Sequence, residues 1–237
     1  MALYTEQAAR ACLRVRDGKR VFYLGPGDHL TPSAREWLRR EQVEILQGEQ
    51  PRQRTYTTPG GGVLTEKPEH MTHLRENVLV PKDHPRIAFR GWIDAVEAEL
   101  LLAQQAAHRE GFGRLVEELE ALLGFLRRLI RADVLGEPVA PWNLLGLSPA
   151  ELREQSHYPQ RYYNQSHFQP SWEDPAALLA VNRLRTVVRQ AELAAYRAFR
   201  DPDGGVTRED ILQALNRASS LCWILEIRLK AGYYKPQ

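Results

Sequence analysis

Apolar residues recur every three or four positions through four long segments after residue 83, which is the spacing of the buried face of an α-helix. Turn and cap signals bound the segments, such as Asp174-Pro175 and the glycine-rich turn at 201–205. The segments run from about residue 86 to 108, from 112 to 132, from 174 to about 201, and from 207 to 229. A capping box at 147–151 predicts a further short helix. Four long helices with short or medium connections predict a helical bundle.

The first 47 residues have a different pattern, in which short β-branched and aromatic runs alternate with capped helices. Thr5 can cap a helix that runs to about Arg16, and Thr31 followed by Pro32 predicts the start of a second helix. The candidate strands are residues 20–24 and 43–46. Because two strands alone are marginally stable, we expect this α/β element to pack against something else.

Glycine, proline, threonine and charged residues dominate the sequence between this element and the helical segments. Residues 47–69 read QGEQPRQRTYTTPGGGVLTEKPE, a composition that predicts a flexible linker. The predicted protein is therefore mainly α, with a small N-terminal α/β element at 1–47, a linker at 48–69 and a bundle of four or five helices at 70–237.

The composition is that of a soluble globular protein, because 43% of the 237 residues are hydrophobic and 26% are charged. A net charge of only +2, with acids and bases mixed, argues against a general binder of nucleic acid or membrane surfaces. Cys12 and Cys222 both lie in predicted helices, which favours a reducing, cytoplasmic compartment. The N-terminus does not have the apolar core of a signal peptide, and no run approaches the roughly 18 apolar residues of a membrane span.

Two arginines and a glutamate lie at the edge of the apolar face of the 174–201 helix, where solvated charge is not expected. At 100° per residue, Arg185, Arg189, Glu192 and Tyr196 share one stripe beside the buried stripe. These charges could form a solvated surface pair worth roughly a few tenths of a kcal/mol. Alternatively, the two guanidinium groups could bind a phosphate or a carboxylate, which their planar geometry suits.

The last predicted helix also has a polar stripe beside its apolar face. Asn216, Ser219, Ser220 and Trp223 recur at helical spacing. These residues could let another helix approach closely, or they could line a ligand pocket in which a few polar groups fix orientation. The spacing alone favours neither interpretation.

Asp94 stands inside the otherwise apolar sequence FRGWIDAVEAELLL of the first bundle helix. A buried carboxylate there would need a cationic partner, and Arg185 or Arg189 is the obvious candidate. The alternative is an ordinary solvated acid on the outer face of the helix.

The connection SHYPQRYYNQSHFQP at 156–170 is rich in aromatic residues and histidine. Such loops more often cover a core or a ligand than stay free. His70 and His73 could suggest a metal, but two histidines without a third ligand make a weak zinc site. We predict no protein-bound metal, and the sequence has no GxGxxG, GxxxxGK[ST], HExxH or GxSxG motif.

Six blocks of sequence, in order along nearly the whole chain, resemble a known family. They read LTPSAREWL, KPEHMTHL, VPKDHPRIAFRGWIDAVEAE, RADVLGEP, LRTVVRQAE and DILQALNRASS. Together they resemble the cobalamin adenosyltransferases of ethanolamine utilisation. These enzymes are related to the ATP:corrinoid adenosyltransferases of the propanediol-utilisation type, and the resemblance to that wider family covers only about residues 80–230.

The resemblance implies a helical bundle, usually trimeric, with active sites between subunits. Members of the family transfer the 5′-deoxyadenosyl group of ATP to the cobalt of reduced cob(I)alamin, forming adenosylcobalamin and releasing triphosphate. The implied substrates are therefore ATP, with Mg²⁺, and cobalamin. The implied role is to supply a B12-dependent ethanolamine ammonia-lyase in the cytoplasm, either inside or outside a bacterial microcompartment.

The family pattern R-T-x-x-R-x-A-E binds ATP, and it matches Arg185, Arg189 and Glu192. An L-N-R motif on the last helix assists, and its asparagine matches Asn216. The resemblance therefore implies that these four residues bind ATP. It also implies that the two arginines are the catalytic residues, because the triphosphate leaves as an anion.

Four more site residues follow from the resemblance. A family aspartate in the first bundle helix pairs with the first arginine, which predicts a salt bridge between Asp94 and Arg185. The lysine just before that helix matches Lys82, a triphosphate contact. The aromatic residue on the cobalamin side matches Phe168, with His167 beside it.

The chain also departs from these families. The N-terminal T-G-D-x-G phosphate loop is missing, and Thr72 and His73 stand near its place as expected ATP contacts. Many ethanolamine-type members have a paired-cysteine metal motif, but residues 47–69 contain no cysteine, so we predict no metal beyond the Mg²⁺ that enters with ATP. Gln190 and Ser220 stand where the wider family often has arginine and aspartate.

Two other classes of function remain open from the sequence. A bundle of this kind could hold or deliver cobalamin without catalysis. The first 47 residues could instead make the chain an interaction module that docks on a microcompartment or on a partner enzyme.

Overall fold

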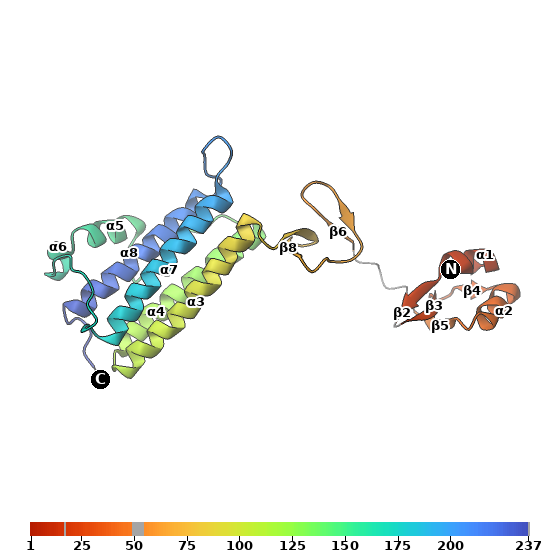
Figure 1. The fold of residues 1–237 in the computed structure, drawn as a ribbon, viewed down its shortest axis with the longest axis horizontal. Helices are drawn as coiled ribbons and strands as arrows, with labels where there is room; N and C mark the ends of the chain where they lie inside the picture. The colour runs from red at the N-terminus through yellow and green to blue at the C-terminus, as the bar shows by residue number, and fades with distance from the viewer. Residues whose placement is uncertain (17, 49–54, 237) are drawn as a thin grey trace. The chain divides into compact units, whose positions relative to one another are not determined.

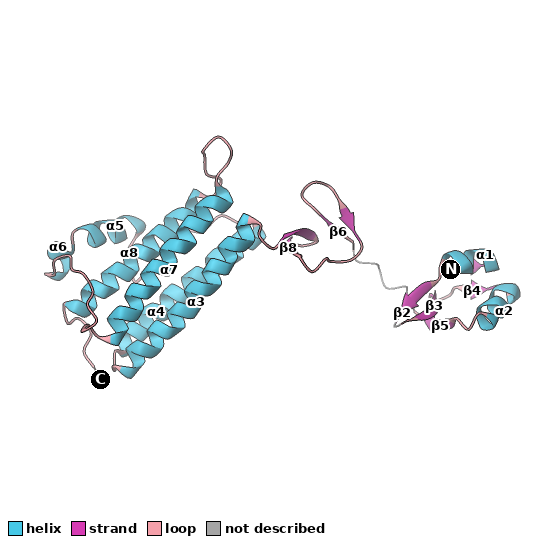
Figure 2. Cartoon of the chain, in the orientation of Figure 1, coloured by secondary structure: helices cyan, strands magenta, loops and turns pink. Residues whose placement is uncertain are grey.

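The computed structural model describes residues 1–16, 18–48 and 55–236, and the chain divides into two compact units. The first unit spans Met1–Thr55 and the second spans Tyr56–Gln237. Short strands and two helices make up the first unit, whereas long helices make up most of the second (Figures 1 and 2). The predicted mainly α fold with a small α/β part is confirmed. Among the described residues, none of the helices combines enough length with enough apolar character to cross a bilayer.

Both helices of the first unit begin at the threonine caps that the sequence predicts. The hydroxyl of Thr5 accepts a hydrogen bond from the backbone of Ala8 at the start of α1 (Glu6–Ala11). Thr31 caps α2 (Pro32–Arg40) in the same way, and a proline occupies the first helical position.

The main sheet of the first unit has three strands, one more than predicted. The unit contains β1 (Leu3–Tyr4), β2 (Arg14–Arg16), β3 (Lys19–Leu24), β4 (His29–Leu30) and β5 (Glu44–Gln47). β3 pairs with β2 in antiparallel and with β5 in parallel orientation, and β1 pairs separately with β4. The predicted first helix was too long, because it ends at Ala11 and residues 14–16 form β2. Gly18, with φ of +77°, permits the tight reversal between β2 and β3.

The first unit has a small core of its own, built by side chains from both helices and from β3. It consists of Ala9, Phe22, Leu24, Ala34, Trp37, Leu38 and Val43. The two helices thus supply the packing surface that a pair of strands would lack.

The second unit opens with a four-stranded sheet at residues 56–81, ahead of the bundle. Its strands are β6 (Tyr56–Thr57), β7 (Val63–Leu64), β8 (Met71–Arg75) and β9 (Val78–Pro81), in the order β7-β6-β9-β8. Within the segment predicted as a linker, residues 56–57 and 63–64 thus form strands, and residues 49–54 lie outside the described residues. Strands of two residues are too short to show a period-2 pattern, which explains why composition was misleading here.

Four long helices form the bundle, close to their predicted bounds. They are α3 (Pro85–Arg109), α4 (Gly113–Leu135), α7 (Ala176–Phe199) and α8 (Glu209–Lys230). α3 packs against both α4 and α7, and α7 packs against α8 (Figure 1). The short helix α5 (Pro149–His157), which begins at the predicted capping box of Ser148, packs against α8 and is followed by α6 (Pro159–Tyr163). The bundle begins at Pro85, whereas the sequence predicted that it begins at residue 70.

A buried carboxylate holds the first turns of α3 against the end of α4. Asp133 is fully buried and accepts hydrogen bonds from Arg86 Nε at 3.0 Å and from Arg90 Nε at 2.7 Å. At the same end of the bundle the ring of Phe89 lies 5.6 Å from that of Phe199, at the end of α7. These contacts fix where α7, and therefore its arginines, stand relative to the start of α3.

Candidate functional site

A cationic pocket of about 710 Å³ opens where α5, α7 and α8 meet. α8 lies between α5 and α7 and packs against both (Figure 1). The connection that precedes α7 supplies the remaining wall, at residues 167–170. The charged side chains that line the pocket are Arg153, Arg185, Arg189 and Arg217. No aspartate or glutamate of the described residues lines it, so its charge favours an anionic ligand.

A second pocket, of about 610 Å³, lies between the end of α4 and residues 137–143. It contains none of the site residues predicted from the sequence. The pocket between α5, α7 and α8 contains five of them: Arg185, Arg189, Asn216, His167 and Phe168. We therefore place the candidate site there.

Three contacts hold the side chain of Arg185 at the edge of the pocket. Its Nε donates to Oε1 of Glu226 at 2.9 Å, and its Nη2 donates to Oδ1 of Asn182 at 2.8 Å. The guanidinium carbon lies 5.7 Å from the centre of the Trp223 ring, which is a cation–π contact. A guanidinium bound on several sides is preorganised, and little conformational entropy is lost when an anion binds it.

Glu226 is fully buried inside the bundle beside Arg185. Its other oxygen, Oε2, has no hydrogen-bond partner among the described residues. Burial raises the pKa of Glu226 to about 7, although the positive charge of Arg185 opposes this shift. Glu226 is thus an unusual carboxylate whose ion pair with Arg185 is expected to depend on pH near neutrality.

Arg189 lies one turn after Arg185 and is exposed to the pocket. No carboxylate within the described ranges comes within 4.0 Å of it. Glu192, the next residue of the stripe, accepts a hydrogen bond at 2.8 Å from Nδ2 of Asn216 on α8. The polar stripes of α7 and α8 therefore meet at this contact, while Arg189 remains exposed.

Aromatic rings stack along the pocket wall next to α8. Phe168 and His167 both stack on Trp223, with ring centroids 5.1 Å and 5.8 Å away. Lys230 Nζ lies 5.6 Å from the centre of the Phe168 ring. The predicted aromatic connection thus covers part of the candidate site instead of staying free in solvent.

The structure does not bring Lys82, Thr72 or His73 into this pocket. Lys82 precedes α3 and pairs with Glu69 at 3.0 Å, at the end of the bundle where α7 finishes. Arg189 lies about 15 Å from that end of α7, at 1.5 Å per residue. Within one chain these predicted ATP contacts are therefore separate from the arginines.

The predicted salt bridge between Asp94 and Arg185 does not form within the chain. Arg185 pairs with Glu226, and Asp94 is exposed on the outer face of α3. The physical reason is that the first bundle helix directs its buried residues, such as Ile93, toward the core and places its neighbour Asp94 outside.

Histidines 70 and 73 do not gather with other ligands. The described residues contain no group of three or more His, Cys, Asp or Glu side chains that could hold a metal ion. The ring of His73 instead lies 5.6 Å from that of Tyr56.

Sequence reasoning missed three residues of the site: Glu226, Arg153 and Arg217. Glu226 could have been found, because it is a carboxylate within the apolar run CWILEIRL and four residues after the buried Cys222. Arg153 gives no such signal, because an arginine on a short helix is usually a solvated residue.

Residues 63–229 match the sequence profile of the family described as cobalamin adenosyltransferase. This chain belongs to that family. Two relatives named corrinoid adenosyltransferase EutT, from Escherichia coli (strain K12) and Salmonella typhimurium (strain LT2), are each 32% identical over 246 aligned residues. Each alignment covers 94% of this chain and 90% of the relative, so the likeness to the cobalamin adenosyltransferases includes the first unit as well as the bundle.

We predict that Glu226→Gln removes a pH-dependent part of the stability. Burial raises the pKa of Glu226 from 4.5 to about 7, so between these values the folded protein holds a proton that the unfolded chain releases. The corresponding part of the free energy of unfolding is present below pH 4.5 and is lost as the pH rises to about 7. Its size is on the order of 3 kcal/mol.

Urea denaturation at about pH 5 and about pH 8 measures this difference. From about pH 5 to about pH 8, the free energy of unfolding of the original protein should fall by about that amount more than that of the Glu226→Gln variant. Glu173→Gln, which removes an exposed carboxylate before α7, is the matched control and should behave like the original protein. Equal pH dependence in the Glu226→Gln variant and the original protein would show that Glu226 titrates normally.

Proposed function

We propose that this chain transfers the 5′-deoxyadenosyl group of ATP to the cobalt of reduced cob(I)alamin, forming adenosylcobalamin and releasing triphosphate. The observation that supports this most directly is the pocket between α5, α7 and α8. There the two arginines of the family's ATP-binding pattern lie beside Asn216, and no carboxylate of the described residues lines the wall. Such a site suits the polyphosphate tail of a nucleotide.

The reaction is a substitution at C5′ of ATP. The electron pair of Co(I) forms the bond to C5′ while the bond from C5′ to the triphosphate oxygen breaks, and that electron pair leaves on the triphosphate. Because the cobalt of the substrate is the nucleophile, the protein needs no acid–base pair. Its contribution is to position the two substrates and to stabilise the charge of the leaving group.

Arg189 and Arg185 divide this task. Arg189 has no carboxylate near it among the described residues, so its full charge is available to the triphosphate. Arg185, partly neutralised by Glu226, holds its position and presents its remaining donors. Loss of one such preorganised cation is typically worth about 2–4 kcal/mol of transition-state stabilisation.

The described residues do not form a Mg²⁺ site in the pocket, because no carboxylate lines it. Mg²⁺ therefore belongs to the proposal as the counter-ion that enters with the triphosphate. No step of the proposed reaction depends on a protein ligand to it.

The stacked wall of Phe168, His167 and Trp223 is the proposed cobalamin side of the pocket. Co(II) is difficult to reduce while its lower axial position is occupied by a ligand. An apolar wall would disfavour that ligand and so make reduction easier.

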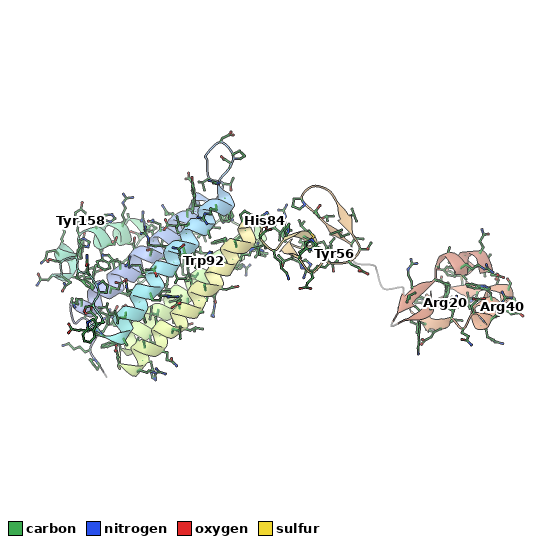
Figure 3. All side chains as sticks on the ribbon, viewed as in Figure 1. Arg20, Arg40, Tyr56, His84, Trp92 and Tyr158 are labelled. Carbon is green, nitrogen blue, oxygen red and sulfur yellow. The ribbon has the colours of Figure 1, made fainter. Side chains whose placement is uncertain are left out.

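We further propose that a second copy of the chain completes the site, within a homotrimer. Large apolar side chains are exposed on the outer faces of α3 and α7, such as Trp92 (Figure 3) at 39% and Leu102 at 58%. Asp94 is exposed on α3. A neighbouring copy could thus supply Asp94 and Lys82, which do not reach the pocket within one chain.

The relatives named EutT support an ethanolamine role, in which the product supplies a B12-dependent ammonia-lyase in the cytoplasm or in a microcompartment. A non-catalytic corrinoid carrier is the alternative. Formation of adenosylcobalamin that requires ATP, followed by its visible absorbance, separates the two. Docking by the first unit is tested by deletion of residues 1–47 and co-purification.

Arg189→Ala should lower turnover by about 100- to 1,000-fold, because the leaving triphosphate loses its uncompensated cation. Far-UV circular dichroism should be unchanged, since the side chain is exposed. Arg197→Ala, which removes an exposed arginine of α7 outside the pocket, is the control and should keep its activity. Near-normal adenosylation by the Arg189→Ala variant would contradict the proposal that Arg189 stabilises the leaving triphosphate.

Phe168→Ala should slow adenosylation that starts from Co(II) more than adenosylation that starts from pre-reduced Co(I). The reason is that loss of the apolar wall affects reduction before it affects the transfer itself. Trp172→Ala changes an 85% exposed aromatic residue of the same connection and should leave both rates unchanged. Equal losses for Phe168→Ala in the two assays would contradict the proposed wall.

Co-expression of two inactive variants tests the shared site. If Lys82 of one copy completes the pocket of another, Lys82→Ala and Arg189→Ala chains should together regain about a quarter of the original activity, because randomly mixed trimers contain some intact sites. Mixed oligomers isolated with two different affinity tags make the comparison direct. Activity no higher than that of either variant alone would show that Lys82 and Arg189 of neighbouring copies do not form one site.

A further inference from the structure

Arg153 and Arg217 form a second pair of cations in the same pocket, apart from the pair on α7. Arg153 comes from α5 and Arg217 from α8. Arg185 and Arg189 come from α7, and α8 packs against both α5 and α7. Arginines from three helices thus line the pocket.

Neither member of the pair forms an ion pair with a carboxylate of the described residues. No carboxylate oxygen comes within 4.0 Å of either guanidinium group in the part of the chain that the structure describes. Arg217 donates from Nη1 to Oδ1 of Asn216 at 2.5 Å, but its Nε is buried and has no partner among those residues. The side chain of Arg153 makes no hydrogen bond within the same residues, so its donors are available.

The two charges also oppose each other. Burial lowers the pKa of Arg217, the nearby charge of Arg153 lowers it further, and Glu192 offsets these effects only in part. Like charges held together in a partly dry site repel, and an anion bound between them would relieve that repulsion. A buried N–H without a partner also gains a hydrogen bond from such an anion.

We propose that Arg153 and Arg217 form a second phosphate-binding subsite of the pocket. The inference rests on the proposed function, which supplies two phosphate-bearing ligands. One is the triphosphate of ATP, whose far end could extend from the α7 arginines across α8. The other is the phosphodiester in the nucleotide tail of cobalamin, since the aromatic wall next to α8 is the proposed corrinoid side.

His157 and Ser156 on α5 fit this subsite. Both line the pocket, and Ser156 is buried with its hydroxyl bound to the carbonyl of Arg153 at 2.9 Å. The His157 ring is also held at that carbonyl, at 2.7 Å from Nδ1. These contacts tie the last turn of α5 together at the point where Arg153 enters the pocket, so α5 can present its arginine at a fixed place.

The experiment uses the full chain with Arg153→Gln and Arg217→Gln, each of which removes one charge and keeps a polar side chain. Arg109→Gln, an exposed arginine of α3 outside the pocket, is the matched control. Calorimetry measures binding of inorganic triphosphate, ATP and adenosine. Steady-state assays measure KM for cobalamin and for cobinamide, which lacks the phosphodiester tail.

If the subsite binds triphosphate, both pocket variants should bind triphosphate and ATP about tenfold more weakly, with adenosine binding unchanged. If it binds the corrinoid phosphodiester, the KM for cobalamin should rise by about the same factor, while the KM for cobinamide stays the same. Either result supports the subsite and identifies which of the two phosphate-bearing ligands binds there. The Arg109→Gln variant should match the original protein in every arm.

Unchanged affinities and KM values in both pocket variants would overturn the subsite. Arg217→Lys keeps the charge and should keep at least part of the affinity, which separates a charge effect from a packing effect at this partly buried residue. Failure of the proposed function is a different result: the unmutated protein would then form no adenosylcobalamin from ATP and reduced cobalamin. Triphosphate binding would still test the subsite in that case.

Discussion

Positive charge without matching carboxylates is the feature on which the rest of the site depends. Four guanidinium groups line one pocket, and Arg185 is the one that the described chain pairs with an acid, Glu226. Arg153, Arg189 and Arg217 have no such partner within the described ranges. Charges arranged in this way are costly in the empty pocket and favourable once a polyanion binds. The chemistry of a triphosphate leaving group fits this imbalance.

The bundle makes that arrangement possible because it places three helices around one space. α7 and α8 pack against each other in the bundle core, to which α7 contributes Ala191 and Ala195 and α8 contributes Ala218. Their polar stripes can then touch, as the contact between Glu192 and Asn216 shows. α5 adds a cation from the other side of α8. At the far end, the buried Asp133 cluster fixes α3 and α4, so the arginines of α7 have a rigid base.

The long helices and the arginine pair could be predicted from the sequence, because helical spacing and a local motif both lie within a few residues. Asp94 could not be placed in the same way. Its supposed partner, Arg185, is on another helix, and that arginine pairs instead with Glu226 of a third helix, a choice that depends on how the helices pack. The strands at residues 56–57 and 63–64 could not be predicted either, because strands of two residues are set by pairing with other strands and not by a local pattern. Arg153 could not be predicted as a site residue, because its place in the pocket depends on how α5 packs on α8.

A crystal structure of the protein grown with ATP and no corrinoid tests the central claim most directly. The account predicts phosphate oxygens within hydrogen-bonding distance of the Arg189 guanidinium, with the adenosine directed toward the wall that holds Phe168. Triphosphate bound at a different place, with no contact to Arg185 or Arg189, would contradict it.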